Sequence, residues 1–326
     1  MAQFWLQIGL IGLGAGTCSA LLFASALSGS MLSLVLFSLA PLPIMIAALG
    51  WSHWAGLAAA VVAAIAAALA ISPFYFVSFL LTIGLPAWWL GYLALLARPA
   101  GADGELEWYP SGRLVLWAAM SGAVIIMAGL SQLGSGEATI RDTLRSIFEQ
   151  ILRAQQHIPT GEPLTVRGVA DPDRLIDILV MLVPLVAAMI STLTQLLNLW
   201  LAARIVKVSG RLRRPWPDLT AIRFPPAAPI ALAAALAGSF LPGSLGLAAS
   251  LPAASLLIAY AALGFAVLHG ITRHSQSRAI VLVGVYTAVA LLLWPLLLMT
   301  LLGLVDSALD LRARVAATRG PPSPFA

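Results

Sequence analysis

The stretch at residues 179–203 reads LVMLVPLVAAMISTLTQLLNLWLAA and contains no charged side chain. As an α-helix it is about 37 Å long, because each residue adds ~1.5 Å along the axis. The hydrocarbon core of a bilayer is about 30 Å thick. This stretch is therefore predicted to cross a membrane, as the centre of a helical span over 175–203.

The rest of the chain repeats this apolar pattern. Charge-free stretches of about span length run over 5–27, 31–50, 54–72, 74–97, 114–133, 227–241, 245–270 and 279–304. The stretch over 227–241 is short, and the turn residues Pro242 and Gly243 join it to the next one as a hairpin. We predict an all-α polytopic transmembrane bundle of about nine helices, with a range of eight to ten, in a single domain over 1–311.

The composition supports a membrane protein and excludes other classes. The chain of 326 residues is 60% hydrophobic and only 10% charged, whereas ordinary soluble domains are ~25% charged. This hydrophobic content excludes a disordered chain, and the single cysteine excludes a disulfide-stapled secreted domain. No cluster of Lys and Arg stands apart from a span, so no nucleic-acid partner is predicted. The expected surroundings are a lipid bilayer.

The connection between the sixth and seventh predicted spans sets the orientation. It holds one acid, Asp218, against six basic residues, which are Arg204, Lys207, Arg211, Arg213, Arg214 and Arg223. Basic loops of membrane proteins stay on the cytoplasmic side. Counting spans from this loop predicts a cytoplasmic N-terminus and a periplasmic insertion over 134–173.

The C-terminus conflicts with this orientation if the ninth segment crosses the membrane once. Arg312, Arg314 and Arg319 would then lie outside. A bend at Trp294-Pro295, with return of the chain, removes the conflict. Both alternatives remain open at this stage, and residues 312–326 are expected to form a disordered tail.

Two acids end the last predicted span. Asp306 and Asp310 are one helical turn apart and are followed by Arg312 and Arg314. A carboxylate deep in a bundle is typical of a proton or cation relay. These acids lie near the end of the span, so a salt-bridge cluster at the membrane interface is the preferred interpretation.

The insertion over 134–173 contains an amphipathic helix. Its apolar residues recur at helical spacing: Ile140, Leu144, Ile147, Phe148, Ile151 and Leu152. Such a helix either rests its apolar face on the bilayer or on the bundle, or covers a binding site as a lid. The sequence Asp171-Pro172-Asp173 then predicts the N-cap and first turn of the sixth span.

Motifs for enzymatic chemistry are missing from the sequence. There is no HExxH, CxxC, GxSxG or Walker glycine loop, and the four histidines are scattered. We therefore expect no enzyme, no catalytic residue, no metal site and no cofactor.

A small-molecule site is predicted where polar or helix-breaking residues interrupt the spans. Pro41 and Pro43 break the second span, and broken helices in transporters expose backbone polar groups to a solute. Ser191, Gln195 and Asn198 share one face of the sixth span. These residues either line a pocket for an unknown small solute or form interhelical hydrogen bonds that hold the bundle together.

A stripe of small residues runs along the first span. Gly12, Gly16, Ala20 and Ala24 recur every four residues, so another helix can approach closely. The stripe either contacts another membrane subunit or packs inside the bundle, and internal packing is slightly preferred.

Several short motifs resemble a known family, the YybS-like bacterial inner-membrane proteins of domain of unknown function 2232. The motifs are Pro41-Leu42-Pro43-Ile44 with Gly50-Trp51, the long insertion leading into Leu182-Val183-Pro184, the run LNLWLAAR over 197–204, and LGLVDSALDLR over 302–312. The resemblance covers the chain up to about residue 316. It implies a multi-pass protein of the bacterial inner membrane.

That family is in turn distantly similar to the substrate-binding components of energy-coupling-factor transporters. In those components an AxxxA face contacts the transmembrane coupling subunit, and Ala20-Leu21-Leu22-Phe23-Ala24 fits this pattern. The present chain has more spans than those six-helix components. The function expected from the sequence is solute binding or transport, with a non-transporting scaffold or envelope-maintenance role as the alternative.

Overall fold

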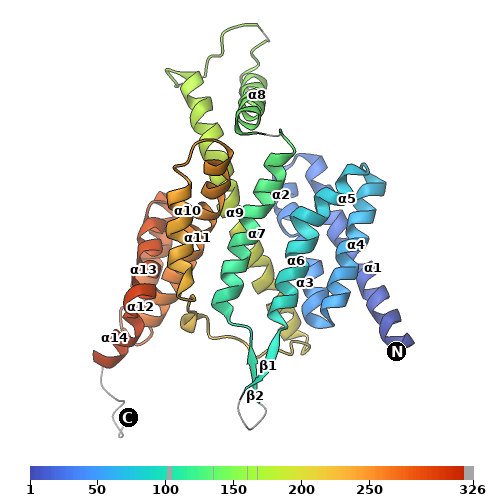
Figure 1. Cartoon of the computed structure of the whole chain (residues 1–326), viewed down its shortest axis with the longest axis vertical. Coiled ribbons are helices and arrows are strands. Elements are labelled where there is room, and N and C mark those ends of the chain that lie inside the picture. Colours follow the sequence, from blue (N-terminus) through green and yellow to red (C-terminus); the bar gives the residue numbers. More distant parts are fainter. Residues whose placement is uncertain (101–104, 135, 160, 167, 319–326) are drawn as a thin grey trace.

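The computed structural model describes residues 1–100, 105–134, 136–159, 161–166 and 168–318. Helices dominate this part of the chain, and most run roughly side by side (Figure 1). Seven helical segments are long and apolar enough to cross a membrane, and three shorter apolar helices accompany them. The prediction of an all-α polytopic bundle is confirmed.

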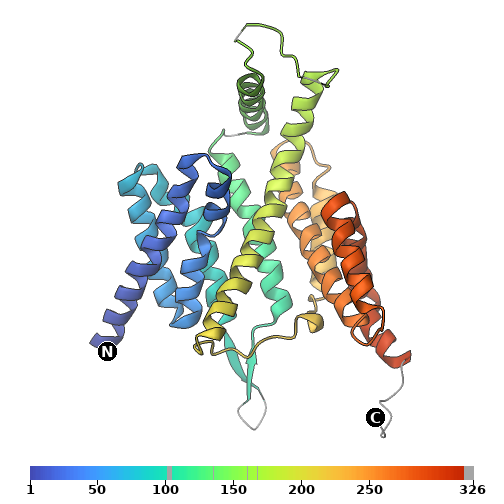
Figure 2. The same cartoon turned by 180° about the vertical axis from the view of Figure 1, so that it is seen from behind.

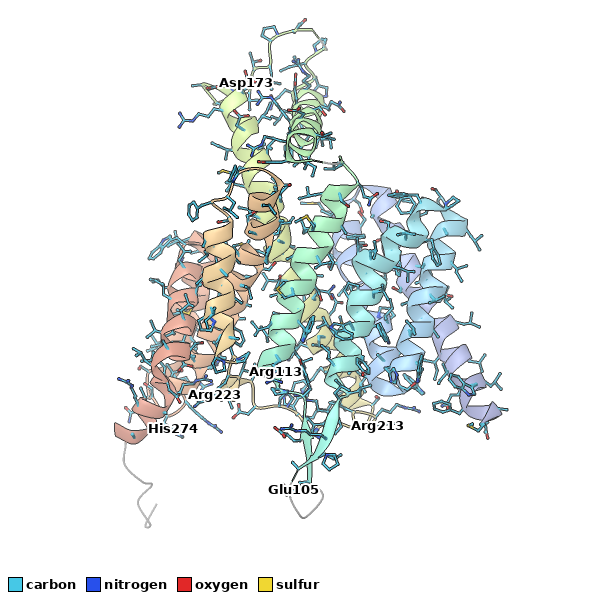
Figure 3. The ribbon with its side chains drawn as sticks, viewed as in Figure 1. Glu105, Arg113, Asp173, Arg213, Arg223 and His274 are labelled. Carbon is cyan, nitrogen blue, oxygen red and sulfur yellow. The ribbon has the colours of Figure 1, made fainter. Side chains whose placement is uncertain are left out.

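The two ends of the bundle differ in charge. The N-terminus, residues 311–318 and the connection that follows residue 208 lie at the end drawn lowest in Figure 1, which we call the basic end. The insertion lies at the opposite end, called the α8 end after its helix α8 (Glu137–Gln156). Figure 3 shows Arg113, Arg213 and Arg223 at the basic end and Asp173 at the α8 end.

The N-terminal helices form one side of the bundle. They are α1 (Ala2–Ala24), η1 (Ser25–Ser28), α2 (Met31–Ser38), α3 (Pro41–Gly50), α4 (His53–Ala70), α5 (Phe74–Phe79), the π-helical turn η2 (Leu80–Gly84) and α6 (Leu85–Ala94). Their shared core is rich in alanine, and Ala59, Ala60, Ala63 and Ala64 of α4 are fully buried. Small side chains allow membrane helices to approach closely, which explains the tight packing on α4.

The middle of the chain starts with a short hairpin that the sequence did not predict. Strands β1 (Ala97–Ala100) and β2 (Glu105–Trp108) pair antiparallel at the basic end, with an ion pair of 2.7 Å between Arg98 and Glu107. Helix α7 (Ser111–Ser131) then returns to the α8 end.

Helix α9 (Pro172–Val208) is the central element. Its 37 residues make it about 55 Å long, so it extends well beyond the hydrocarbon core. Asp171 caps its first turn, accepting a hydrogen bond from the Arg174 backbone at 3.1 Å as predicted. Figure 2 shows α9 running obliquely between the N-terminal and C-terminal helices, and it contacts α3, α7 and α11.

The C-terminal part of the chain contains six helices and two hairpins, one of α10 with α11 and one of α12 with α13. The helices are η3 (Leu219–Ala221), α10 (Ala227–Gly238), α11 (Ser244–Ile271), α12 (Arg278–Leu292), α13 (Pro295–Leu309) and α14 (Leu311–Thr318). The first hairpin turns at Gly243, whose φ of 76° favours glycine. The second turns at Leu293 and Trp294, immediately before Pro295 begins α13.

The predicted bend at Trp294-Pro295 is therefore confirmed, and the single crossing is wrong. Seven long and three short apolar segments give ten apolar helical segments in the described residues, which is the upper limit of the predicted range of eight to ten. The short helices are too short to cross a whole bilayer; the 12 residues of α10, for example, span about 18 Å.

The C-terminal end is held at the basic end by ion pairs. Asp310 pairs with Arg223 at 2.6 Å, and Asp306 pairs with Arg312 at 2.7 Å. Arg312 also donates to the Thr220 carbonyl at 2.7 Å. This is the salt-bridge cluster preferred from the sequence.

The predicted disordered tail over 312–326 needs a correction. Residues up to Thr318 form α14, which Arg312 anchors near its start, and residues 319–326 lie outside the described part of the chain.

Candidate functional site

The two elements predicted to form a site do meet in the structure. Asn198 of α9 donates from its amide nitrogen to the carbonyl of Ser38 at 2.8 Å, and to the Thr194 carbonyl at the same distance. Ser38 is the last residue of α2 before the break. The Ser38 carbonyl lacks the usual helical donor, because the backbone N–H of Leu42 donates to the Leu39 carbonyl instead. Asn198 therefore satisfies a carbonyl that the break leaves free.

The prolines shape this break without lining a described cavity. Pro41 is buried in the first turn of α3, and Pro43 is half-buried. The carbonyl of Ala40, next to the break, accepts a hydrogen bond of 2.6 Å from the Ser19 hydroxyl. Polar side chains from α1 and α9 thus compensate the interrupted helix from both sides.

The polar face of α9 is buried to different degrees. Ser191 is half-buried, whereas Gln195 and Asn198 are 2% and 0% exposed. The side-chain oxygens of Gln195 and Asn198 have no hydrogen-bond partner among the described residues. Asn198 thus makes one hydrogen bond within α9, to Thr194, and one to another helix, to Ser38.

A separate cavity lies elsewhere on α9, at the α8 end. Its volume is about 390 Å³, within the range typical of small-molecule sites. Helix α8 forms one wall, α9 a second, and the turn between α10 and α11 a third. Pro41, Pro43, Ser191, Gln195 and Asn198 do not line it.

Polar and charged groups face this cavity from each wall. Glu137 and Arg141 of α8 line it and pair with each other at 2.6 Å. Ser239, which follows α10, and Ser250 of α11 contribute hydroxyl groups. Pro184 of α9 removes the helical donor of the Val180 carbonyl, and both residues line the cavity. The remaining lining is mainly Leu, Ile and Met, so the cavity suits a solute with polar and apolar parts.

Two sets of contacts hold helix α8 against the bundle, beside the cavity. Ile140 and Leu144 pack into a cluster with residues of α7, α9 and α11. Arg145 pairs with Asp173 at 2.6 Å and with Asp177, both in the first two turns of α9. The apolar face of the insertion therefore rests on the bundle, and the same placement closes one side of the cavity.

Sequence reasoning missed the lining of this cavity. The Glu137 and Arg141 spacing was visible, but a salt bridge at this spacing is usually a solvated surface pair. The useful signals were the amphipathic insertion and the uncharged turn at Pro242 and Gly243, which the fold brings together.

The small-residue stripe of α1 packs internally. A β-carbon on Gly12 would lie 2.7 Å from the Ala58 side chain, and one on Gly16 would lie 2.7 Å from the Ala59 carbonyl, both on α4. Ala20 is buried and Ala24 is half-buried. Helix α4 therefore occupies the face of the stripe at Gly12 and Gly16, which favours the internal-packing alternative at these two positions.

Across the described ranges, no group of three His, Cys, Asp or Glu side chains is placed to hold a metal ion. The fold and the cavity define a multi-pass helical membrane protein with a pocket at one end of the bundle. The chain belongs to the family described as predicted membrane protein DUF2232, whose model matches residues 17–307. No curated protein and no solved structure matches the chain.

Proposed function

We propose that this protein binds a small solute in the cavity at the α8 end, as a substrate-binding or transport protein of the bacterial inner membrane. The observation that carries the proposal is the cavity of about 390 Å³ under α8, with charged and polar groups on a mainly apolar wall. Pockets of this kind orient a ligand by a few polar groups and bind it by apolar burial.

The proposed solute is small and carries both charges or strong hydrogen-bonding groups. Glu137 and Arg141 present opposite charges at the rim, and they can separate to bind a cationic and an anionic group of one molecule. Ser239, Ser250 and the Val180 carbonyl supply further hydrogen-bonding partners.

The orientation proposed for the molecule places the basic end in the cytoplasm. Arg113, Arg213 and Arg223 lie there (Figure 3), with the N-terminus and α14. The cavity then opens toward the periplasm. Without an ATPase motif in the sequence, active transport would need a partner subunit or an ion gradient.

The test is a thermal-shift screen of the purified protein against polar and zwitterionic solutes. A solute that binds the folded state raises its stability by mass action, by about 2.7 kcal/mol at a hundredfold excess over Kd. Ser250→Leu fills part of the cavity and should abolish the shift. Ala248→Leu, on an exposed position of the same helix, is the matched control and should preserve it.

Glu137→Gln provides a second variant that changes charge without adding volume. It should weaken binding of a solute with a cationic group and leave the melting temperature without solute nearly unchanged, because the pair is partly exposed. If no solute shifts the wild-type protein, or if Ser250→Leu responds like the wild type, the cavity is not the binding site.

A scaffold role is the second candidate, and a specific observation favours it. Several polar side chains inside the bundle donate hydrogen bonds to backbone carbonyls of other segments: Ser19 to Ala40, Asn198 to Ser38 and Thr300 to Leu257. These contacts hold helices together without leaving a polar pathway. A screen without any solute-induced shift would favour this role.

A further inference from the structure

Arg214 is a half-buried arginine without a carboxylate partner among the described residues. It follows α9 in the chain, and its guanidinium donates to the Ser111 hydroxyl at 3.0 Å and weakly to the Ala94 carbonyl at 3.5 Å. The ion pairs of the described chain do not include it. Burial lowers the pKa of Arg214, but an arginine stays protonated in proteins. A desolvated positive charge is therefore held with only neutral partners.

An apolar cavity of about 140 Å³ adjoins this guanidinium. Leu49, Leu114, Leu196, Leu199 and Ala203 supply part of its wall from α3, α7 and α9. Arg214 and Ser111 are polar groups in a lining that is otherwise mainly aliphatic or aromatic. The cavity thus combines a hydrocarbon-like interior with one cationic side.

The cavity lies beside an exposed residue of a helix that is long and apolar enough to cross a membrane. Trp200 forms part of its wall, and its side chain is 44% exposed on α9, the central spanning helix. Trp216, from the connection after α9, lies on the same wall. Tryptophan is typical of the interface between hydrocarbon and headgroups. A membrane lipid can therefore reach the cavity sideways without leaving the bilayer.

Further basic side chains surround the site. Arg204 and Lys207 lie over the Trp216 ring at 5.7 and 4.7 Å, and Arg211 lies over the Trp51 ring at 4.6 Å. These cations have aromatic rather than carboxylate partners. The local field consequently favours an anion, and Ser111, in the first turn of α7, adds the positive end of a helix dipole.

We propose that this site binds an anionic phospholipid of the leaflet at the basic end. The phosphate is bound by Arg214 and Ser111, and part of one acyl chain fills the apolar cavity. Charge complementarity selects the headgroup, because a zwitterionic lipid brings its own cation close to Arg204 and Lys207. The acyl chain distinguishes this ligand from free phosphate, since the cavity wall offers few hydrogen-bonding groups.

The proposal is tested with purified protein in detergent, to which dioleoyl-phosphatidylglycerol, dioleoyl-phosphatidylcholine or glycerol phosphate is added. Native mass spectrometry measures retained lipid, and the melting temperature reports stabilisation. We expect phosphatidylglycerol to be retained and to raise the melting temperature. Phosphatidylcholine and glycerol phosphate should have little effect.

Two variants and one control variant locate the site. Arg214→Gln should weaken phosphatidylglycerol retention about tenfold, as for loss of a charge-assisted hydrogen bond. Arg213→Gln removes the same charge from the neighbouring residue, which is exposed and reaches only the Trp51 carbonyl, and it should retain the lipid. Ala203→Leu leaves every charge in place but narrows the cavity, and it should also lose retention.

Four results would overturn the proposal. Equal retention of both phospholipids would show that the site does not select the headgroup. Equal losses of retention in the two arginine variants would show that only the net charge of the region matters. Stabilisation by glycerol phosphate equal to that by the lipid would leave an anion site without a chain pocket. If Arg214→Gln does not fold, Ala203→Leu decides, because unchanged lipid retention in that variant contradicts the acyl-chain site.

Discussion

Gly264 of α11 lies directly against the backbone carbonyl of Met299 on α13, and no space remains between them for a β-carbon. Gly303 of α13 is in the same way pressed against the Tyr260 carbonyl. The two helices therefore touch through their backbones, and Thr300 adds a hydrogen bond to the Leu257 carbonyl at 3.2 Å. This contact fixes α13 as the returning helix, which brings α14 to the basic end.

Gly264→Ala should destabilise the C-terminal hairpin. The added methyl group forces the two backbones apart, and overpacking typically costs about 1–3 kcal/mol. Thermal unfolding of the purified protein measures the loss. Gly284→Ala is the control, because a β-carbon there meets no atom within 4 Å. Equal melting temperatures for the two variants would contradict the close packing.

The small-residue stripe on α1 can be tested in the same way, to distinguish packing inside the bundle from contact with another subunit. Gly16→Ala places a β-carbon 2.7 Å from the Ala59 carbonyl, so the isolated protein should lose about 1–3 kcal/mol of stability. Gly14→Ala points into open space on the same helix and should be neutral. Unfolding in sodium dodecyl sulfate measures both. A stable Gly16→Ala protein that loses a co-purifying subunit would restore the partner-contact interpretation.

Asn198→Leu should lower the stability of the protein even without solute. It leaves the Ser38 carbonyl buried without its donor, and a polar contact between membrane helices contributes about 0.6–2 kcal/mol. Leu197→Ala, on the exposed face of the same turn, should cost less. If Asn198→Leu has the melting temperature of the wild type, Asn198 is not a structural contact.

Arg312→Gln should unfold or loosen the C-terminal end. Asp306 is 3% exposed, and its partner Arg312 is 12% exposed. Removing one member of a buried pair leaves an uncompensated charge and typically costs about 3 kcal/mol or more. Hydrogen exchange of α13 and α14 measures the effect, and Arg314→Gln, at an exposed position, is the control. Unchanged exchange in Arg312→Gln would show that the pair contributes little.

Reporter tags test the topology. Tags inserted within 208–218 and at the C-terminus should both report the cytoplasm, because the hairpin of α12 and α13 returns the chain to the basic end. A tag near Glu162 should report the opposite side. A C-terminal tag on the opposite side from the 208–218 tag would contradict the hairpin.

The sequence by itself determined the class and the arrangement of spans. Charge-free runs of span length predict membrane helices because unpaired backbone groups and charges are costly in hydrocarbon. The basic connection predicted an orientation, and Pro242-Gly243 and Trp294-Pro295 predicted turns at positions where the structure has them. Asp171 predicted the start of α9, since an N-cap acts within one turn.

Only the tertiary structure decided which residues meet. Asn198 and Ser38 are 160 residues apart in the chain, and no local pattern shows that a side-chain amide satisfies a carbonyl left free at a distant helix break. The cavity under α8 combines residues from three helices and the turn between α10 and α11, and the partners of Arg214 come from two other segments. Apolar helices carry little information about which faces pair, because many faces are equally apolar, so packing and the few polar contacts select the arrangement.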